Sequence, residues 1–233
     1  MPKIDVCLTP ELIPLFKMED KIVVVIDILR ATSCMVTAFE HGVSEILPVA
    51  TLEESAAHGQ QGYITAAERN GLKMDGFDLD NSPFSYMDPI LQRKRICVTT
   101  TNGTKAIVRS AHAKKVIIGS FLNLKSVCEY LYIRGLDVIL LCAGWKGQIN
   151  AEDTLFAGAV IEHLKDSFEI GNDSALIARD LYNCHKEDLF KFISTTSHFQ
   201  RLNRLNIHKD IHFCLQHSIY NCLPRLEGNI LVI

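Results

Sequence analysis

The 233-residue sequence has no long apolar run. Its most apolar stretches, such as Ile22–Ile26 and Val138–Leu141, fall far short of the roughly 20 residues that a membrane-spanning helix needs. The first residues, MPKIDVCLTPELIPL, also lack the basic region, apolar stretch and cleavage site of a signal peptide. These absences predict a cytoplasmic protein with no membrane partner.

The chain also lacks a strong charge of either sign. With 24 Lys and Arg against 27 Asp and Glu, the formal net charge is -3. A protein that binds nucleic acid usually carries a marked basic excess, so no nucleic-acid partner is expected. A small anionic ligand remains compatible with this charge, because the field inside a pocket can differ in sign from that of the whole molecule.

The eight cysteines form no C-x-x-C motif. Several lie within apolar runs, at 96–98 and 141–143, which is typical of reduced cysteines in the core of a cytoplasmic protein. Five His and Cys residues of the C-terminal third match no zinc-binding spacing, and we interpret them as scattered surface histidines and buried cysteines. They are His208, His212, Cys214, His217 and Cys222.

Short β-branched runs alternate with helix-like segments along most of the chain. This alternation predicts an α/β fold with three layers, α/β/α, around a mainly parallel sheet, and a mixed sheet is left open. We expect a single domain over 1–233, and a small C-terminal subdomain from about residue 170 is left open. Strands are predicted at 21–26, 44–49, 62–66, 95–99, 115–118, 137–142 and 229–233. Helices are predicted at 53–61, 124–133, 151–165 and 174–184, and two more end near residues 40 and 110.

Three predicted strands stop abruptly in polar or glycine-rich residues and then enter a helix, at 27–32, 99–104 and 143–153. A fourth junction, Glu68-Arg69, follows another strand. Because the carboxyl ends of parallel strands meet at one edge of a sheet, and ligands bind there, these segments are expected to form one site.

The residue types at these ends suit phosphoryl transfer, which needs cationic groups, aimed N–H or O–H donors and an oriented nucleophile. Arg30, Arg69 and Lys146 could bind acidic groups, and the 99–104 turn offers donors at a helix start. Four acids, Asp27, Glu68, Glu152 and Asp153, are hard oxygen ligands of the kind that Mg²⁺ uses.

Structural interpretations compete with these roles. The 99–104 turn reads equally well as a capped helix start. Glu152 and Asp153 could simply favour the dipole of the helix that they begin, and Arg69 and Lys146 could be solvated. Asp27 favours a functional role, since an unpaired acid after a buried strand would be costly. Motifs of other phosphate-binding classes are missing. No D-x-D follows a predicted strand, and no G-x-x-x-x-G-K-S/T loop occurs. A tyrosine-phosphatase-like loop needs a Cys and an Arg six residues apart, but Cys97 and Cys142 are followed at that distance by Gly103 and Gln148.

Taken together and in order, four motifs resemble the 2-phosphosulfolactate phosphatase family. They are Asp27-Ile28-Leu29-Arg30-Ala31-Thr32, Glu68-Arg69 with 76–83, Thr99–Thr104, and Cys142-Ala143-Gly144 with Glu152-Asp153-Thr154-Leu155. The resemblance implies an α/β/α fold and Mg²⁺-dependent hydrolysis of 2-phospho-3-sulfolactate to 3-sulfolactate and phosphate, a step toward coenzyme M. The chain departs from the family pattern at Trp145-Lys146, where a smaller residue followed by Arg is expected.

The predicted site combines these observations with the resemblance. Catalytic roles are predicted for Asp27, Arg30, Glu68, Arg69, Asn102, Glu152 and Asp153, of which Asp27, Glu152 and Asp153 are predicted to bind Mg²⁺. Substrate contacts are predicted for Thr32, Asn81, Ser82, Thr100, Thr101, Gly103, Thr104 and Lys146. Two alternatives stay open: hydrolysis of another small acidic phosphate ester, and non-catalytic binding of a sulfonate or phosphate. Assembly into a homo-oligomer is also left open.

Overall fold

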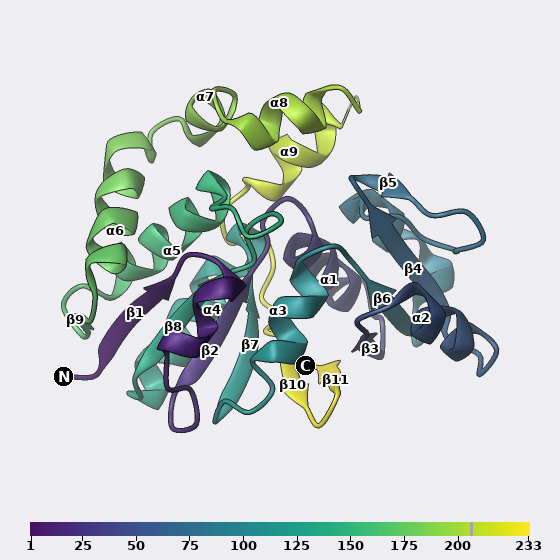
Figure 1. Cartoon of the computed structure of the whole chain (residues 1–233), viewed down its shortest axis with the longest axis horizontal. Helices are drawn as coiled ribbons and strands as arrows, with labels where there is room; N and C mark the ends of the chain where they lie inside the picture. The colour runs from purple at the N-terminus through teal and green to yellow at the C-terminus, as the bar shows by residue number, and fades with distance from the viewer. Residues whose placement is uncertain (206) are drawn as a thin grey trace.

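A computed structural model describes residues 1–205 and 207–233, whose strands form one twisted, mixed sheet with helices on both faces (Figure 1). The strand order is β5-β4-β6-β3-β11-β10-β7-β2-β8-β1-β9. The strands are β1 Lys3–Cys7, β2 Ile22–Ile26, β3 Glu45–Pro48, β4 Ile64–Arg69, β5 Leu72–Lys73, β6 Arg95–Thr99, β7 Lys115–Gly119, β8 Val138–Cys142, β9 Glu169–Ile170, β10 Arg225–Glu227 and β11 Ile230–Val232.

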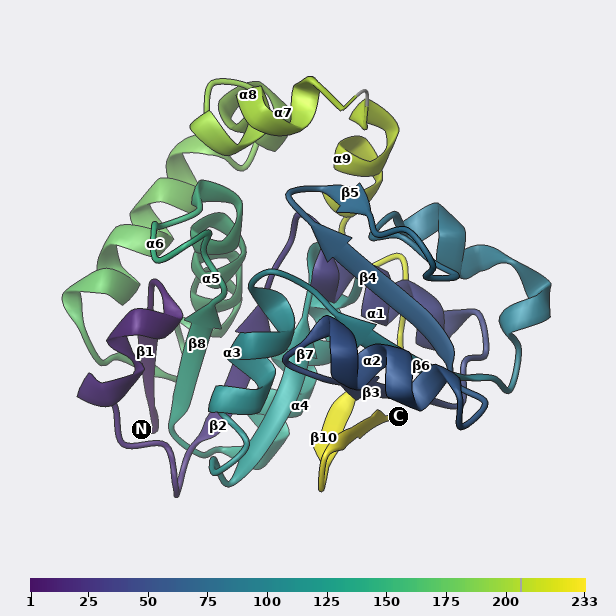
Figure 2. The same ribbon diagram turned by 45° about the vertical axis from the view of Figure 1, so that its right-hand side comes forward.

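The sheet consists of two parallel parts joined by a hairpin from the C-terminus. Strands β3, β6 and β4 pair in parallel, and so do β7, β2, β8, β1 and β9. The hairpin β10–β11 lies between them and runs antiparallel to both β7 and β3. The chain therefore ends in the middle of the sheet, as Figure 2 also shows.

Two hydrophobic layers enclose the sheet because its central strands are apolar on both faces. Ile22, Val24 and Ile26 of β2 belong to one core cluster, and Val23 and Val25 belong to the other. Helices α4 Leu124–Arg134, α5 Ala151–Leu164 and α6 Asp173–His185 supply the first cluster, and α1 Ala31–Glu40 and α3 Gly103–Arg109 supply the second. Helix α2 Leu52–Gly59 packs beside β4 and β6.

The predicted fold class is confirmed: the molecule is an α/β structure with helices on both sides of one large mixed sheet. The predicted strands and helices all occur, with ends that shift by a few residues. The single-domain organisation stays a prediction. No helix of the described residues has the length and apolar character needed to cross a membrane.

Several elements were not predicted. Strand β1 was missed, as were strand β10 and three short helices, α7 Leu189–Ile193, α8 Ser197–Asn203 and α9 His208–Cys214. Helices of five to seven residues span too few turns to give a clear 3.6-residue period, so packing decides them rather than local pattern. These three helices run above the carboxyl ends of the strands and cover that edge of the sheet (Figure 1).

The cysteines and the C-terminal histidines have packing partners in the fold. Six of the eight cysteines are buried and all eight are free thiols. His212 stacks on Phe190, and His217 packs against Phe121. Within 1–205 and 207–233, no three His, Cys, Asp or Glu residues stand together as a preformed metal-binding group.

Candidate active site

A polar pocket opens at the carboxyl edge of the sheet, beneath helix α8. It holds about 430 Å³, including the part open to solvent. Its wall is formed by residues at the ends of β2 and β4, in the turn after β6, in the loop after β8 and in α8. The lining residues are Asp27, Leu29, Arg30, Glu68, Asn70, Gly71, Asn81, Thr101, Asn102, Gly144, Trp145, Asn150, His198, Arg201 and Leu202. The predicted convergence of strand ends thus produces a real cavity.

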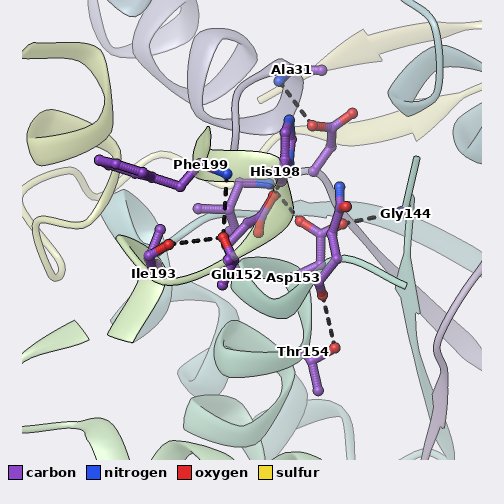
Figure 3. Close-up of polar contacts among 12 residues, drawn as sticks. Ala31, Gly144, Glu152, Asp153, Thr154, Ile193, His198 and Phe199 are labelled. Carbon is purple, nitrogen blue, oxygen red and sulfur yellow. Dashed lines mark hydrogen bonds and ion pairs between the residues drawn. The ribbon is translucent and has the colours of Figure 1, made fainter. Parts of the chain in front are cut away.

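Asp27 stands directly after β2 and is 8% exposed. Its Oδ1 accepts a hydrogen bond from the Ala31 N–H at 3.3 Å, so the start of α1 holds the carboxylate in place (Figure 3). Burial, assisted by the charges of Glu68 and Glu152, raises the pKa of Asp27 from its ordinary value of 3.8 to about 7, although the Ala31 hydrogen bond and His198 act to lower it. A carboxyl group with such a pKa, on the wall of a pocket, is a mark of a functional site.

The turn after β6 crosses to this carboxylate. A Cβ at Gly103 would lie 2.8 Å from Asp27 Oδ2 and 2.7 Å from the Ala31 side chain, so only glycine allows this approach. Thr100 and Thr104 exchange hydrogen bonds between their backbone N–H groups and hydroxyls, each of 3.2 Å, and both are buried. These two threonines therefore build the turn, whereas Thr101 and Asn102 line the pocket.

Glu68 and Arg69 end β4 and lead into a tight hairpin. Asn70 and Gly71, at φ 57° and 85°, connect β4 to β5 in a two-residue turn of the kind that Asn-Gly favours. Glu68 accepts a short hydrogen bond from the Gly71 N–H and faces the pocket. Arg69 points away and donates to the Glu68 and Thr99 carbonyls and the Thr99 hydroxyl, so its donors are already used by the protein.

Glu152 and Asp153 stand in the first turn of α5 and are buried, and neither lines the pocket (Figure 3). Asp153 accepts N–H hydrogen bonds from Ile28 at 2.9 Å and Gly144 at 3.1 Å, which ties the ends of β2 and β8 together. Burial, then Glu152 and Asp27, raise the pKa of Asp153 well above its ordinary value. Asp27, Glu152 and Asp153 thus crowd one buried region, where the charge of Glu152 opposes the ionisation of the two aspartates.

His198 of α8 completes this cluster. Its Nδ1 makes a short contact with Glu152 Oε1, and the side chain also lines the pocket. The second Glu152 oxygen, Oε2, is buried and has no hydrogen-bond partner among the described residues. A carboxylate that orients an imidazole leaves the other ring nitrogen able to pass a proton to or from a bound group. The bare Glu152 oxygen is a candidate ligand for a cation.

Arg30 also lines the pocket and is 4% exposed. Its guanidinium makes a short ion pair with Asp210 of α9 and donates to the Gly71 carbonyl at 3.1 Å. One side chain thereby joins the end of β2, the β4–β5 turn and the C-terminal helices, all around the pocket.

The remaining predicted residues divide by position. Asn81 lines the pocket, and its buried Oδ1 has no partner among the described residues. Thr32 lies behind Asp27, where its hydroxyl bonds the Asp27 backbone. Ser82 follows Asn81 but is absent from the pocket wall. Lys146 is exposed and borders a neighbouring pocket with Lys105 and Arg109.

Sequence reasoning missed the contribution of the C-terminal helices. His198, Arg201 and Asp210 lie in segments with no periodic pattern, and nothing in their spacing pointed to the strand ends. The Asn70-Gly71 turn could have been found, because Asn-Gly after a strand is a strong hairpin signal.

Comparison with known proteins matches the chain to a family. A family model described as 2-phosphosulpholactate phosphatase matches residues 7–229, which includes nearly the whole chain. The chain belongs to the 2-phosphosulfolactate phosphatase family. A Clostridium tetani protein named "Probable 2-phosphosulfolactate phosphatase" is 34% identical over 98% of this chain and 99% of its own length. Proteins of the same name from Thermotoga petrophila and Caldanaerobacter subterraneus are 38% and 37% identical, over 94% and 91% of this chain and 95% and 90% of their own lengths.

Family membership confirms the resemblance and gives the enzyme class: the protein is a phosphoric monoester hydrolase. The matched region of this chain, residues 7–229, contains every residue that lines the pocket. The carboxylate cluster, the N–H-rich strand ends and the two arginines on its wall are therefore the candidate active site.

Proposed function

We propose that this phosphatase hydrolyses 2-phospho-3-sulfolactate to 3-sulfolactate and phosphate with the help of Mg²⁺. The observation that carries the proposal is the pocket itself, where Asp27 and Glu68 line the same cavity as Arg30 and Arg201. A substrate with three acidic groups needs several separate cationic or N–H-rich anchors, and its phosphate needs charge neutralisation during transfer. The pocket supplies both kinds of group.

The donor set of the cluster supports a hard divalent cation. Asp27, Glu152 and Asp153 are packed together, the pKa values of Asp27 and Asp153 are raised, and Glu152 Oε2 lacks a partner among the described residues. Mg²⁺ commonly uses one or two carboxylates and completes its shell with water and substrate oxygens. Asp27 and Glu152 are the ligands that we assign, and Asp153 remains a predicted ligand that also fixes the two strand ends. When bound, Mg²⁺ would neutralise charge on the phosphate oxygens.

The chain's own residues then have distinct tasks. Arg30, immobilised by Asp210, presents positive charge to the phosphate. Thr101 and Asn102, on the turn that Gly103 brings close to Asp27, offer polar side chains to the bound ester. Helix α8 covers the pocket and limits the access of bulk water, and His198 is held by Glu152 where it can hold or release a proton.

The test is phosphate release from 2-phospho-3-sulfolactate, first with Mg²⁺ and then with EDTA. Fast release that EDTA abolishes is expected. Phosphate release that persists in EDTA would reject the role of the metal. If this ester is inert while the folded protein with Mg²⁺ hydrolyses another small acidic phosphate ester, the substrate assignment is wrong.

A further inference from the structure

Arg201 differs from the other arginine of the pocket wall and from Arg69 because its donors are uncommitted. Arg30 forms an ion pair with Asp210 and donates a hydrogen bond to Gly71, and Arg69 donates hydrogen bonds to Glu68 and Thr99. Across 1–205 and 207–233, the Arg201 guanidinium has no hydrogen bond or ion pair. A half-buried, unpaired guanidinium that lines a pocket is costly unless a ligand completes it.

The guanidinium is nevertheless held in a defined place. Its Cζ lies 3.5 Å above the Trp145 ring, within the range of a stacked cation–π contact. Trp145 itself stands on a closed turn, with N–H and carbonyl hydrogen bonds of 2.9 Å to Gln148 in both directions. Lys146 and Gly147 adopt the positive φ angles, 49° and 79°, that such a turn requires. Trp145 therefore positions Arg201 before any ligand arrives.

From this geometry we infer that Arg201 binds the sulfonate of the substrate, an inference that rests on the proposed function. The phosphate must reach Asp27, where the strand ends and the predicted metal ligands lie. The sulfonate is attached one carbon farther from the phosphate-bearing carbon than the carboxylate, so it reaches farther from Asp27, toward the covering helix α8. A guanidinium is weakly hydrated and offers parallel donors, which suits a bulky, weakly hydrated oxyanion.

Local charges agree with a binding role rather than a structural ion pair. Burial lowers the pKa of Arg201, while the charges of Glu152 and Glu68 raise it. The side chain is thus near the acidic cluster without being neutralised by contact with any described carboxylate. An incoming sulfonate would add the missing direct partner.

The inference is tested by the selectivity of Arg201→Met for two esters, 2-phospho-3-sulfolactate and 2-phospholactate, which lacks the sulfonate. Loss of a charge-assisted bidentate contact should lower kcat/KM for the sulfonate ester by about 10- to 100-fold. The loss for 2-phospholactate should be at least about tenfold smaller. Arg201→Lys, which keeps the charge but not the planar fork, should recover only part of the selectivity.

Arg204→Met, an exposed change at the end of the same helix, is the matched control and should leave both values unchanged. If Arg201→Met lowers kcat/KM equally for the two esters, Arg201 binds the phosphate. If kcat/KM falls for neither ester, Arg201 binds neither the phosphate nor the sulfonate. Either result overturns the inference. If the wild-type protein hydrolyses neither ester, the proposed function fails separately. Thermal stabilisation by 3-sulfolactate but not by lactate, abolished in Arg201→Met, would still support a sulfonate site, and its absence would reject one.

Discussion

Asp27→Asn should abolish most activity and yet make the metal-free protein more stable at pH 8. The change removes a charge while keeping an oxygen that can accept the Ala31 N–H. If Asp27 binds Mg²⁺ beside the phosphate, kcat/KM should fall by about 10³-fold, because a metal ion supplies several kcal/mol of charge stabilisation in the transition state. Phosphate release with saturating Mg²⁺ measures this loss.

The gain in stability follows from the raised pKa of Asp27. The unfolded chain loses this proton near its ordinary value of 3.8, whereas the folded protein keeps it up to about pH 7. Between these values the folded state binds more protons, so the free energy of unfolding of the wild type falls as the pH rises. Asparagine does not titrate, so the variant should exceed the wild type by up to about 4 kcal/mol at pH 8, and by little at pH 4.

Urea unfolding in EDTA at both pH values checks this. Asp20→Asn, in the exposed turn that precedes β2, is the matched control and should change neither stability nor activity appreciably. An Asp27→Asn protein that is less stable than the wild type at pH 8 would mean that a cation of the chain already compensates the carboxylate. The interpretation of Asp27 as a strained, functional acid would then be wrong.

Asp210→Ala should produce the second large effect, this time on stability and activity together. Asp210 and Arg30 form a buried ion pair between segments 180 residues apart, with side-chain exposures of 9% and 4%. Removing one partner of such a pair leaves an uncompensated charge and typically costs about 3–5 kcal/mol. Because Arg30 loses its anchor to α9 as well, activity should also fall.

A surface pair gives the control. Arg179 and Asp180 lie 3.6 Å apart, but Asp180 is 64% exposed, so Asp180→Ala should cost less than about 1 kcal/mol. The double variant Arg30→Met/Asp210→Leu, which replaces the pair by apolar groups, should regain much of the stability but none of the activity. If Asp210→Ala alone were as stable and as active as the wild type, the ion pair would neither fasten α9 nor position Arg30.

The parts of the fold that could be predicted are those that local sequence decides. Strands such as β2 and β8 are apolar at every position because both of their faces are covered. These apolar runs indicated where the strands lie, and their alternation with helices indicated parallel pairing. Strand β1 escaped prediction because it contains Asp5, which pairs with Lys21 at 2.9 Å, a contact that only the folded chain supplies. Strand β10, unlike β11, also escaped prediction, because its place is set by the gap that the hairpin fills between the two parallel parts.

The residues of the site also divide into those that local sequence indicates and those that only tertiary packing brings to the pocket. Asp27, Glu68 and Glu152 could be found because each sits beside a strand end whose position the pattern reveals. The partners that define their chemistry could not. Glu152 meets His198 across 46 residues, and Arg30 meets Asp210 across 180, in short helices whose place depends on tertiary packing. Sequence therefore indicated the acids at the strand ends and Arg30, but not His198, Arg201 and Asp210, which come from the C-terminal helices.

The most direct test of the account is to locate the metal and the product in crystals grown with Mn²⁺, 3-sulfolactate and phosphate, since Mn²⁺ replaces Mg²⁺ in oxygen sites and scatters anomalously. The account predicts an anomalous peak at Asp27 and Glu152, phosphate beside it near Arg30, and the sulfonate on Arg201. Metal and anions bound elsewhere, for example beside Lys105 and Arg109, with this pocket empty, would contradict it.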